Sequence, residues 1–173
     1  MRAQRRYGSS LIRKIESTDQ VKRERAKRRD VEAMHGRALV RWANLMAVAG
    51  RPELAFLLHV PNGGARSAST GAELKRQGVR RGVWDYFLPM QRRPDEAMPY
   101  AGLWIELKEP SERRSIRGGL SPQQMAFGRF VHGHGFATVV AYEWTEARDA
   151  LAAYLDAQVV PFFWCPLGTE NLT

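Results

Sequence analysis

Apolar residues recur at helical spacing between Asp30 and Gly50, and this spacing predicts a helix with one buried face. Asp30 belongs to the residue types that cap helix N-termini, and Gly50 followed by Pro52 predicts where the helix ends. The positions that would form its apolar face are Val31, Met34, Ala38, Leu39, Trp42, Leu45 and Met46. Residues 1–29 hold few large apolar residues, so we expect them to be weakly helical or disordered and to order on contact with nucleic acid.

Short apolar runs further along the chain predict strands. They cover residues 54–60, 83–88, 103–108 and 137–141. Helices are expected at 70–77, from the Ser121 cap to about His132, and at 146–156. This order predicts an α/β fold, with a small central mixed β-sheet flanked by helices on both faces. We therefore divide the chain into a basic leader (1–29), a folded domain (30–158) and an apolar tail (159–173).

The charge of the chain is concentrated at its N-terminus. The net charge is +9, yet residues 1–30 hold 11 Lys and Arg against 4 Asp and Glu, so the rest of the chain is close to balanced. Such a basic segment can bind a phosphate backbone without reading sequence, or it can serve as a solubilising tail, and charge alone does not decide between them.

Composition excludes several other classes of protein. Cys165 is the only cysteine, so the chain cannot form an internal disulfide or a thiolate-rich zinc site. No apolar run reaches the roughly 18 to 20 residues that a membrane span requires. We therefore expect a cytoplasmic protein without a membrane partner.

Three polar residues lie in runs that are otherwise apolar. Asp85 interrupts one run, while Glu106 and Lys108 alternate with apolar residues in another and therefore share a face, about 7 Å apart along the strand. If the two strands are neighbours, both carboxylates converge beside an ammonium, as at a Mg²⁺ or Mn²⁺ site that activates water. An Asp followed some twenty residues later by Glu-x-Lys also occurs by chance in many proteins. The alternative is therefore an exposed Glu/Lys pair on a strand and an unrelated Asp in a turn.

A wider set of motifs resembles the virus-type replication-repair nuclease (VRR-NUC) family, a branch of the PD-(D/E)xK restriction-endonuclease-like superfamily. Their common order and spacing are more specific than any one of them, and the resemblance extends more loosely from about Glu32 to Leu155. The matching pieces are residues 61–64 (PNGG), 74–75 (LK), 78–85 (GVRRGVWD), 102–108 (GLWIELK) and 120–124 (LSPQQ).

The resemblance implies a role for each matching residue. Asp85 corresponds to the family's metal-binding aspartate, although Trp84 replaces the usual proline, and Glu106 and Lys108 correspond to its Glu-x-Lys element. Gln124 corresponds to a glutamine that reaches the metal centre from the following helix. Glu32 resembles the acidic residue of the first helix and would be a further metal ligand and catalytic helper.

The first-helix match is weaker than the rest. Gly36 stands where a glutamine is expected, and His35 could contact phosphate instead.

Further polar and basic residues before the Asp85 strand are candidates for binding nucleic acid. A plain turn and a solvated charged surface are the alternatives for them. The candidates are Asn62, Gly63, Arg66, Lys75, Arg80 and Arg81.

These patterns lead to a hypothesis of a metal-dependent DNA endonuclease of phage or bacterial replication and repair. It would act on duplex or branched DNA such as four-way junctions, or with weak sequence specificity, as a homodimer with Mg²⁺ or Mn²⁺ and no organic cofactor. Two alternatives stay open: a non-catalytic nucleic-acid-binding protein of the same fold, and a nuclease that cuts RNA or reads a sequence.

Overall fold

The centre of the molecule is a four-stranded mixed β-sheet in the computed structural model, which describes residues 4–61, 68–92 and 100–156. The strands follow the chain order: β1 (Leu58–His59), β2 (Tyr86–Leu88), β3 (Leu103–Leu107) and β4 (Ala137–Ala141). β1 pairs with β2 and β2 with β3 in antiparallel orientation, whereas β3 and β4 are parallel. Parallel strands need a crossover connection, which is usually a helix, and the sequence supplies one between β3 and β4.

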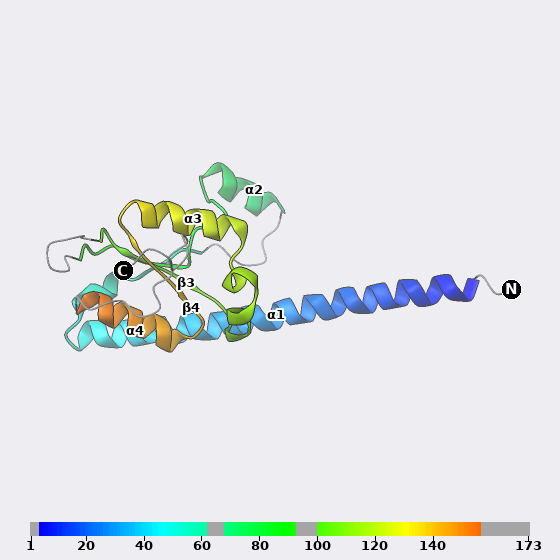
Figure 1. Ribbon diagram of the computed structural model, residues 1–173, viewed down its shortest axis with the longest axis horizontal. Coiled ribbons are helices and arrows are strands. Elements are labelled where there is room, and N and C mark those ends of the chain that lie inside the picture. The colour runs from blue at the N-terminus through cyan, green and yellow to red at the C-terminus, as the bar shows by residue number, and fades with distance from the viewer. Residues whose placement is uncertain (1–3, 62–67, 93–99, 157–173) are drawn as a thin grey trace.

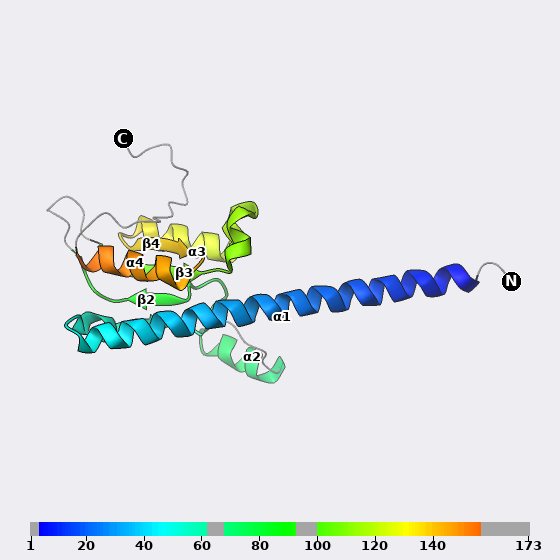
Figure 2. The ribbon, with the colours of Figure 1, turned by 90° about the horizontal axis from the view of Figure 1, so that it is seen from below.

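Helices cover both faces of the sheet (Figure 1). α1 (Gln4–Val48) and α4 (Trp144–Leu155) pack on one face, and α3 (Pro122–Gly133), which joins β3 to β4, covers the other. α2 (Ala68–Arg76) lies to the side of this body, beyond α1 in Figure 2. The α/β fold with a mixed sheet and helices on both faces, as expected from the sequence, is confirmed.

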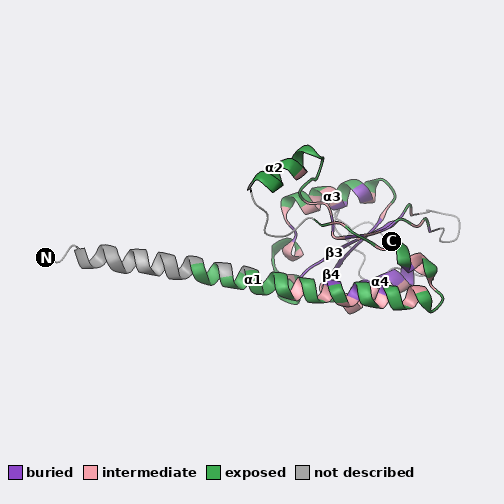
Figure 3. Ribbon diagram, turned by 180° about the vertical axis from the view of Figure 1, so that it is seen from behind, coloured by how far each residue is buried: buried purple, intermediate pink, exposed green. Residues whose placement is uncertain are grey.

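Strand β3 divides its side chains between two cores. Leu103, Ile105 and Leu107 are buried in the larger core, which α1 and α4 cover. Trp104 faces the other way and packs with Phe127 of α3, and the buried Trp84 belongs to the same smaller core. Buried residues concentrate in β3, β4 and the inner side of α4 in Figure 3. Glu106 alternates with the apolar residues of β3, so it lies on the α3 side of the sheet.

The first helix is longer than the sequence indicated. The prediction that it begins at Asp30 is wrong: α1 begins at Gln4, and Asp30 lies inside the helix rather than capping it. No proline precedes Pro52, and Arg, Lys, Gln, Glu and Ala, which favour helices, are frequent in residues 4–29. The N-terminal part of α1 extends well beyond the sheet (Figures 1 and 2).

The predicted strand at 54–60 is also largely wrong. Pro52–Phe56 forms a 3-10 helix, and only Leu58 and His59 pair with β2. Pro52 suits the first turn of a helix, and this turn buries Leu54 while Phe56 remains 66% exposed. The apolar run predicted a buried strand, but Leu54 is its only buried side chain. The apolar tail, residues 159–173, lies outside the described residues.

The chain between β3 and α3 forms two short 3-10 helices, Pro110–Arg114 and Ile116–Gly119. Arg28 of α1 forms ion pairs with Glu109 and Glu112 at the first of them, at 3.7 and 3.5 Å. This contact ties the middle of α1 to the segment that follows Lys108. Among the described residues, no helix has the length and apolar character needed to span a membrane.

Candidate active site

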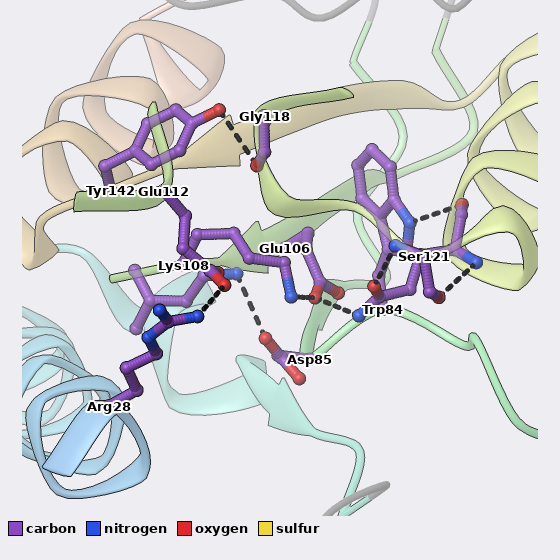
Figure 4. Close-up of polar contacts among 11 residues, drawn as sticks. Arg28, Trp84, Asp85, Glu106, Lys108, Glu112, Gly118, Ser121 and Tyr142 are labelled. Carbon is purple, nitrogen blue, oxygen red and sulfur yellow. Dashed lines mark hydrogen bonds and ion pairs between the residues drawn. The ribbon is translucent and has the colours of Figure 1, made fainter. Parts of the chain in front are cut away.

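Asp85 and Glu106 are brought together by the pairing of β2 with β3. Asp85 directly precedes β2, and the register Tyr86 to Ile105 continues to place it opposite Glu106. The backbone N–H of Leu107 donates a hydrogen bond of 3.0 Å to Asp85 Oδ2, which fixes the carboxylate at the end of the strand (Figure 4). The predicted convergence of the two acids is therefore present.

Lys108 completes the cluster. It directly follows β3, and its backbone N–H donates to the carbonyl of Ala141 at 2.8 Å. Its Nζ lies 2.6 Å from Glu106 Oε1. Glu106 is 1% exposed and Lys108 is 8% exposed, so both charges of this ion pair are withdrawn from water.

Gln124 reaches the same carboxylate from the first turn of α3. Its Nε2 donates to Glu106 Oε1, and its own Oε1 accepts from the backbone N–H of Ser121 at 2.9 Å. Ser121 Oγ accepts in turn from the backbone N–H of Gln124, so the two residues form a capping box. The capping box at the start of α3 thus also orients the Gln124 side-chain amide toward Glu106.

Trp84 anchors this helix start to the Asp85 segment. Its indole Nε1 donates a hydrogen bond of 2.9 Å to the carbonyl of Gln124, and its side chain is fully buried. The residue that departs from the family pattern therefore connects the segments that carry Asp85 and Gln124 (Figure 4).

The acids in this cluster resist ionisation. Burial, and then the charge of Asp85, raise the pKa of Glu106 to about 8 despite the nearby Lys108 ammonium. Burial also raises the pKa of Asp85. Burial alone would lower the pKa of Lys108, but Glu106, with Glu32 and Asp85, raises it above its usual value. In the metal-free protein Lys108 is therefore an ammonium.

Glu32 of α1 lies at the edge of the cluster. Its side chain is half-buried, and burial raises its pKa. Lys108 opposes that rise and Asp85 adds to it, so Glu32 is within electrostatic reach of both. The first helix therefore does contribute an acidic residue to this region, as predicted.

The donor set fits a hard divalent cation. Glu106 Oε2 is buried and has no hydrogen-bond partner among the described residues, and a buried carboxylate oxygen in this condition is costly unless a cation compensates it. Asp85 lies opposite on the neighbouring strand, so these two acids are the pair that would hold the cation. Among the described residues, no group of three or more His, Cys, Asp and Glu is gathered closely enough to form a metal cluster by itself. Glu32 as a direct ligand stays a prediction.

The predicted nucleic-acid contacts have mixed outcomes. Asn62, Gly63 and Arg66 lie outside the described residues. Lys75, on α2, and Arg80 and Arg81, in the loop after it, are exposed, and their role in binding stays a prediction.

His35 has another partner in the fold. Its Nδ1 accepts a hydrogen bond of 3.3 Å from the backbone N–H of Trp144, at the start of α4. This contact joins α1 to α4 through one ring nitrogen, and the role of His35 in contacting phosphate stays a prediction.

A groove beside the cluster was not predicted from the sequence. It has a volume of about 1180 Å³ and runs between α1 and the segments around β1 and β2. Asp85 and Glu32 line it, together with Arg29, Arg37 and Arg41. Arginines spaced by multiples of four share one face of a helix, and this spacing was the signal that the sequence offered.

Comparisons with known proteins support the fold. No family profile and no curated protein matches the chain. The chain is similar to a solved structure described as "VRR_NUC domain protein", with a TM-score of 0.58 and 23% identity over 74% of this chain and 90% of that one. At this identity the likeness establishes a shared fold, which is the fold that the sequence motifs implied.

Proposed function

We propose that this chain is a metal-dependent DNA endonuclease that hydrolyses phosphodiester bonds. The observation that carries the proposal is the buried cluster of Asp85, Glu106 and Lys108, of which Asp85 also lines a groove together with three arginines. A buried ion pair is weak support for stability, because desolvation offsets its attraction. Asp85 and Glu32, the two other acids near the Glu106–Lys108 pair, repel the charge of Glu106. An arrangement that is unfavourable for stability is typical of sites that carry out chemistry.

Asp85 and Glu106 would hold Mg²⁺ or Mn²⁺. When bound, the cation supplies charge neutralisation at the phosphate and a water of lowered pKa. The protein contributes the fixed geometry: Leu107 N–H orients Asp85, and Gln124 and Lys108 orient Glu106. Such preorganisation avoids rearrangement of the side chains during the reaction.

Lys108 would act as a donor of hydrogen bonds and positive charge. Its raised pKa in the metal-free protein favours an ammonium that orients the attacking water or stabilises the charge that develops on the phosphate. Lys108 could remove a proton from the water only as a neutral amine. The bound cation would therefore have to lower the pKa of Lys108. Gln124 would keep Glu106 in position and is proposed as a positioning residue.

We further propose that the substrate is duplex or branched DNA, such as a four-way junction, cut with weak or no sequence specificity. The concentration of basic residues in α1 supports phosphate binding, and the likeness to the VRR_NUC domain protein supports a nuclease role. A homodimer, acting in phage or bacterial DNA replication and repair, would present two sites for cutting two strands.

The test is cleavage of supercoiled plasmid and of a synthetic four-way junction with Mn²⁺, comparing the unaltered protein with Lys108→Ala. Cleavage should require the metal, stop with EDTA and fall at least about a hundredfold in the variant. Arg129→Ala, at an exposed position of α3, is the matched control and should retain activity. Equal activity in the unaltered protein and in Lys108→Ala would refute the proposal.

A non-catalytic DNA-binding protein of the same fold is the second candidate. It is favoured by one observation: Lys108 and Gln124 already satisfy Glu106 Oε1 without a metal. The same assay separates the two candidates, because this protein would bind the junction and leave it intact.

A further inference from the structure

The groove beside the cluster has one wall formed by a single face of α1. Arg29, Ala33, Arg37 and Arg41 follow one another at intervals of four residues, and all of them line it. His59 of β1 and Tyr86 of β2 belong to the opposite side. The groove is therefore open along the helix and reaches the cluster at Asp85.

The arginines flank the acidic residue that marks the position of the cluster along α1. At the helical rise of 1.5 Å per residue, Arg29 lies about 4.5 Å before Glu32, and Arg37 and Arg41 lie about 7.5 and 13.5 Å after it. The positive charges are thus distributed on both sides of the point where a phosphodiester would be cut. Along the helix, Arg29 is followed by Glu32 and then by Arg37 and Arg41, so the acidic residue has basic residues on both sides.

Arg37 and Arg41 are available for an external ligand. Both are exposed, and neither forms an ion pair with another residue in the part of the chain that the structure describes. Arg28, on another side of the same helix, is held by Glu109 and Glu112. Among the described residues, Arg28 therefore serves the packing of the helix, whereas Arg37 and Arg41 in the groove have no ion-pair partner.

We propose that this groove binds the sugar-phosphate backbone of DNA, with Arg37 and Arg41 contacting phosphates on one side of the cut and Arg29 on the other. This inference rests on the proposed function, since it assumes that the strand enters the cluster at Asp85. Guanidinium groups match phosphate oxygens in geometry and charge. Val40 and Leu45 also line the groove, but the three arginines on the same wall would repel the same surface of a second copy of the chain.

The experiment measures binding without cleavage. In a Lys108→Ala background, the affinity for a short fluorescein-labelled DNA duplex is followed by anisotropy over a series of KCl concentrations. The test variant adds Arg37→Gln and Arg41→Gln. The matched control adds Arg114→Gln and Arg129→Gln, which remove the same charge from exposed positions that do not line the groove.

Loss of two phosphate contacts should make the plot of log affinity against log salt shallower by about 1.8, with affinity at low salt reduced at least about tenfold. The control should keep the slope within about 0.5 of the background. A variant with Arg37→Lys and Arg41→Lys should recover most of the slope, because it keeps the charge.

Two results would overturn the proposal. One is a slope in the test variant equal to that of the control. The other is a change of oligomeric state in sedimentation with the DNA slope unchanged, which would assign the groove to a second copy of the chain. Because binding is measured in a cleavage-deficient background, failure of the nuclease proposal in the unaltered protein does not alter this readout.

Discussion

At the scale of single residues, the site depends on a carboxylate that the fold buries at a cost. Glu106 is 1% exposed and accepts from Lys108 and Gln124 on one oxygen, while its other oxygen has no partner in the part of the chain that the structure describes. Such a group stores unfavourable free energy that a bound cation would relieve. Stability measurements can therefore test the site independently of catalysis.

Lys108→Met should destabilise the metal-free protein strongly. The substitution keeps an apolar stem of similar length and leaves Glu106 buried without its counter-charge, which costs about 3 kcal/mol of unfolding free energy above pH 8. Near pH 5, where Glu106 holds a proton, the loss should be smaller. Urea denaturation at both pH values measures this, and Lys75→Met on exposed α2 should change stability by less than about 0.5 kcal/mol. Equal losses at the two pH values would contradict the account.

The raised pKa of Glu106 also predicts how stability depends on pH. Its pKa is about 8 in the folded protein against 4.5 for an ordinary glutamate, so between these pH values the folded state binds a proton that the unfolded state releases. The contribution of Glu106 to the unfolding free energy should therefore be highest below about pH 4.5. It should fall by a few kcal/mol as the pH rises from there through 8.

Glu106→Gln should remove this part of the pH dependence, measured by denaturation in EDTA. Glu24→Gln, at an exposed position of α1, is the control and should keep it. Parallel stability curves for the unaltered protein and Glu106→Gln would show that Glu106 titrates normally.

Residue types and spacing indicated that Asp85, Glu106 and Lys108 would converge if their strands were neighbours, because these residues lie in or next to regular elements. Gln124 was predicted only from the resemblance to the VRR-NUC family. The groove arginines were not predicted. Their grouping depends on which face of α1 is left uncovered, and that is decided by the packing of the helix against β2 and α4.

At the scale of elements, the first turn of α3 determines the orientation of the Gln124 side chain. Ser121→Ala removes the hydroxyl that caps the helix and should lower unfolding free energy by about 1 kcal/mol. Because the same turn positions the Gln124 amide on Glu106, the variant should also lose activity when assayed well below its melting temperature. Ser115→Ala, in the loop before α3, is the control for activity. Full activity in Ser121→Ala would show that the cap does not position Gln124.

The contact between α1 and β2 is set by a glycine. A Cβ added at Gly36 would lie 2.5 Å from the Tyr86 hydroxyl oxygen but 3.7 Å from the ring carbon that bears it. Tyr86 thus occupies the space that a larger side chain at position 36 would need. Gly36→Ala should destabilise the protein by about 1 to 2 kcal/mol despite the higher helix propensity of alanine.

Tyr86→Phe should reverse that effect, because it removes the clashing oxygen. In this background Gly36→Ala should stabilise the protein by about 0.5 to 1 kcal/mol. A double-mutant cycle by thermal or chemical denaturation measures the change of sign. Additive effects of the two substitutions would contradict the predicted contact.

Elements with strong local signals were predicted well, and the others failed for identifiable reasons. Ala137–Ala141 forms β4 as expected, and α3 begins directly after the Ser121 cap. The start of α1 was misjudged, because a possible cap at Asp30 does not end a helix whose preceding residues also favour helix. The apolar run after Pro52 was misjudged, because apolar character does not distinguish a strand from a short 3-10 turn.

At the scale of the whole molecule, a basic helix extends from a compact α/β body that carries the candidate site (Figure 2). Residues 1–18 contain 5 Lys and Arg against 1 Glu. This charge balance is consistent with a segment that binds an external polyanion.

Deletion of residues 2–18 should weaken DNA binding and make its salt dependence shallower, while leaving the melting temperature of the body within a few degrees. Junction cleavage at saturating DNA should keep its rate, because the deleted residues lie far along α1 from Glu32. Binding and cleavage assays on the same preparation check this. A loss of the saturated rate with binding unchanged would instead give this segment a part in the reaction.

The most direct measurement is the position of Mn²⁺ in crystals of the protein, located by anomalous scattering. We expect a peak between the carboxylates of Asp85 and Glu106, beside the Lys108 ammonium, and its absence in crystals of Glu106→Gln. A protein that binds no Mn²⁺ there, or holds it equally well without Glu106, would contradict the assignment of this cluster as a metal-dependent nuclease site.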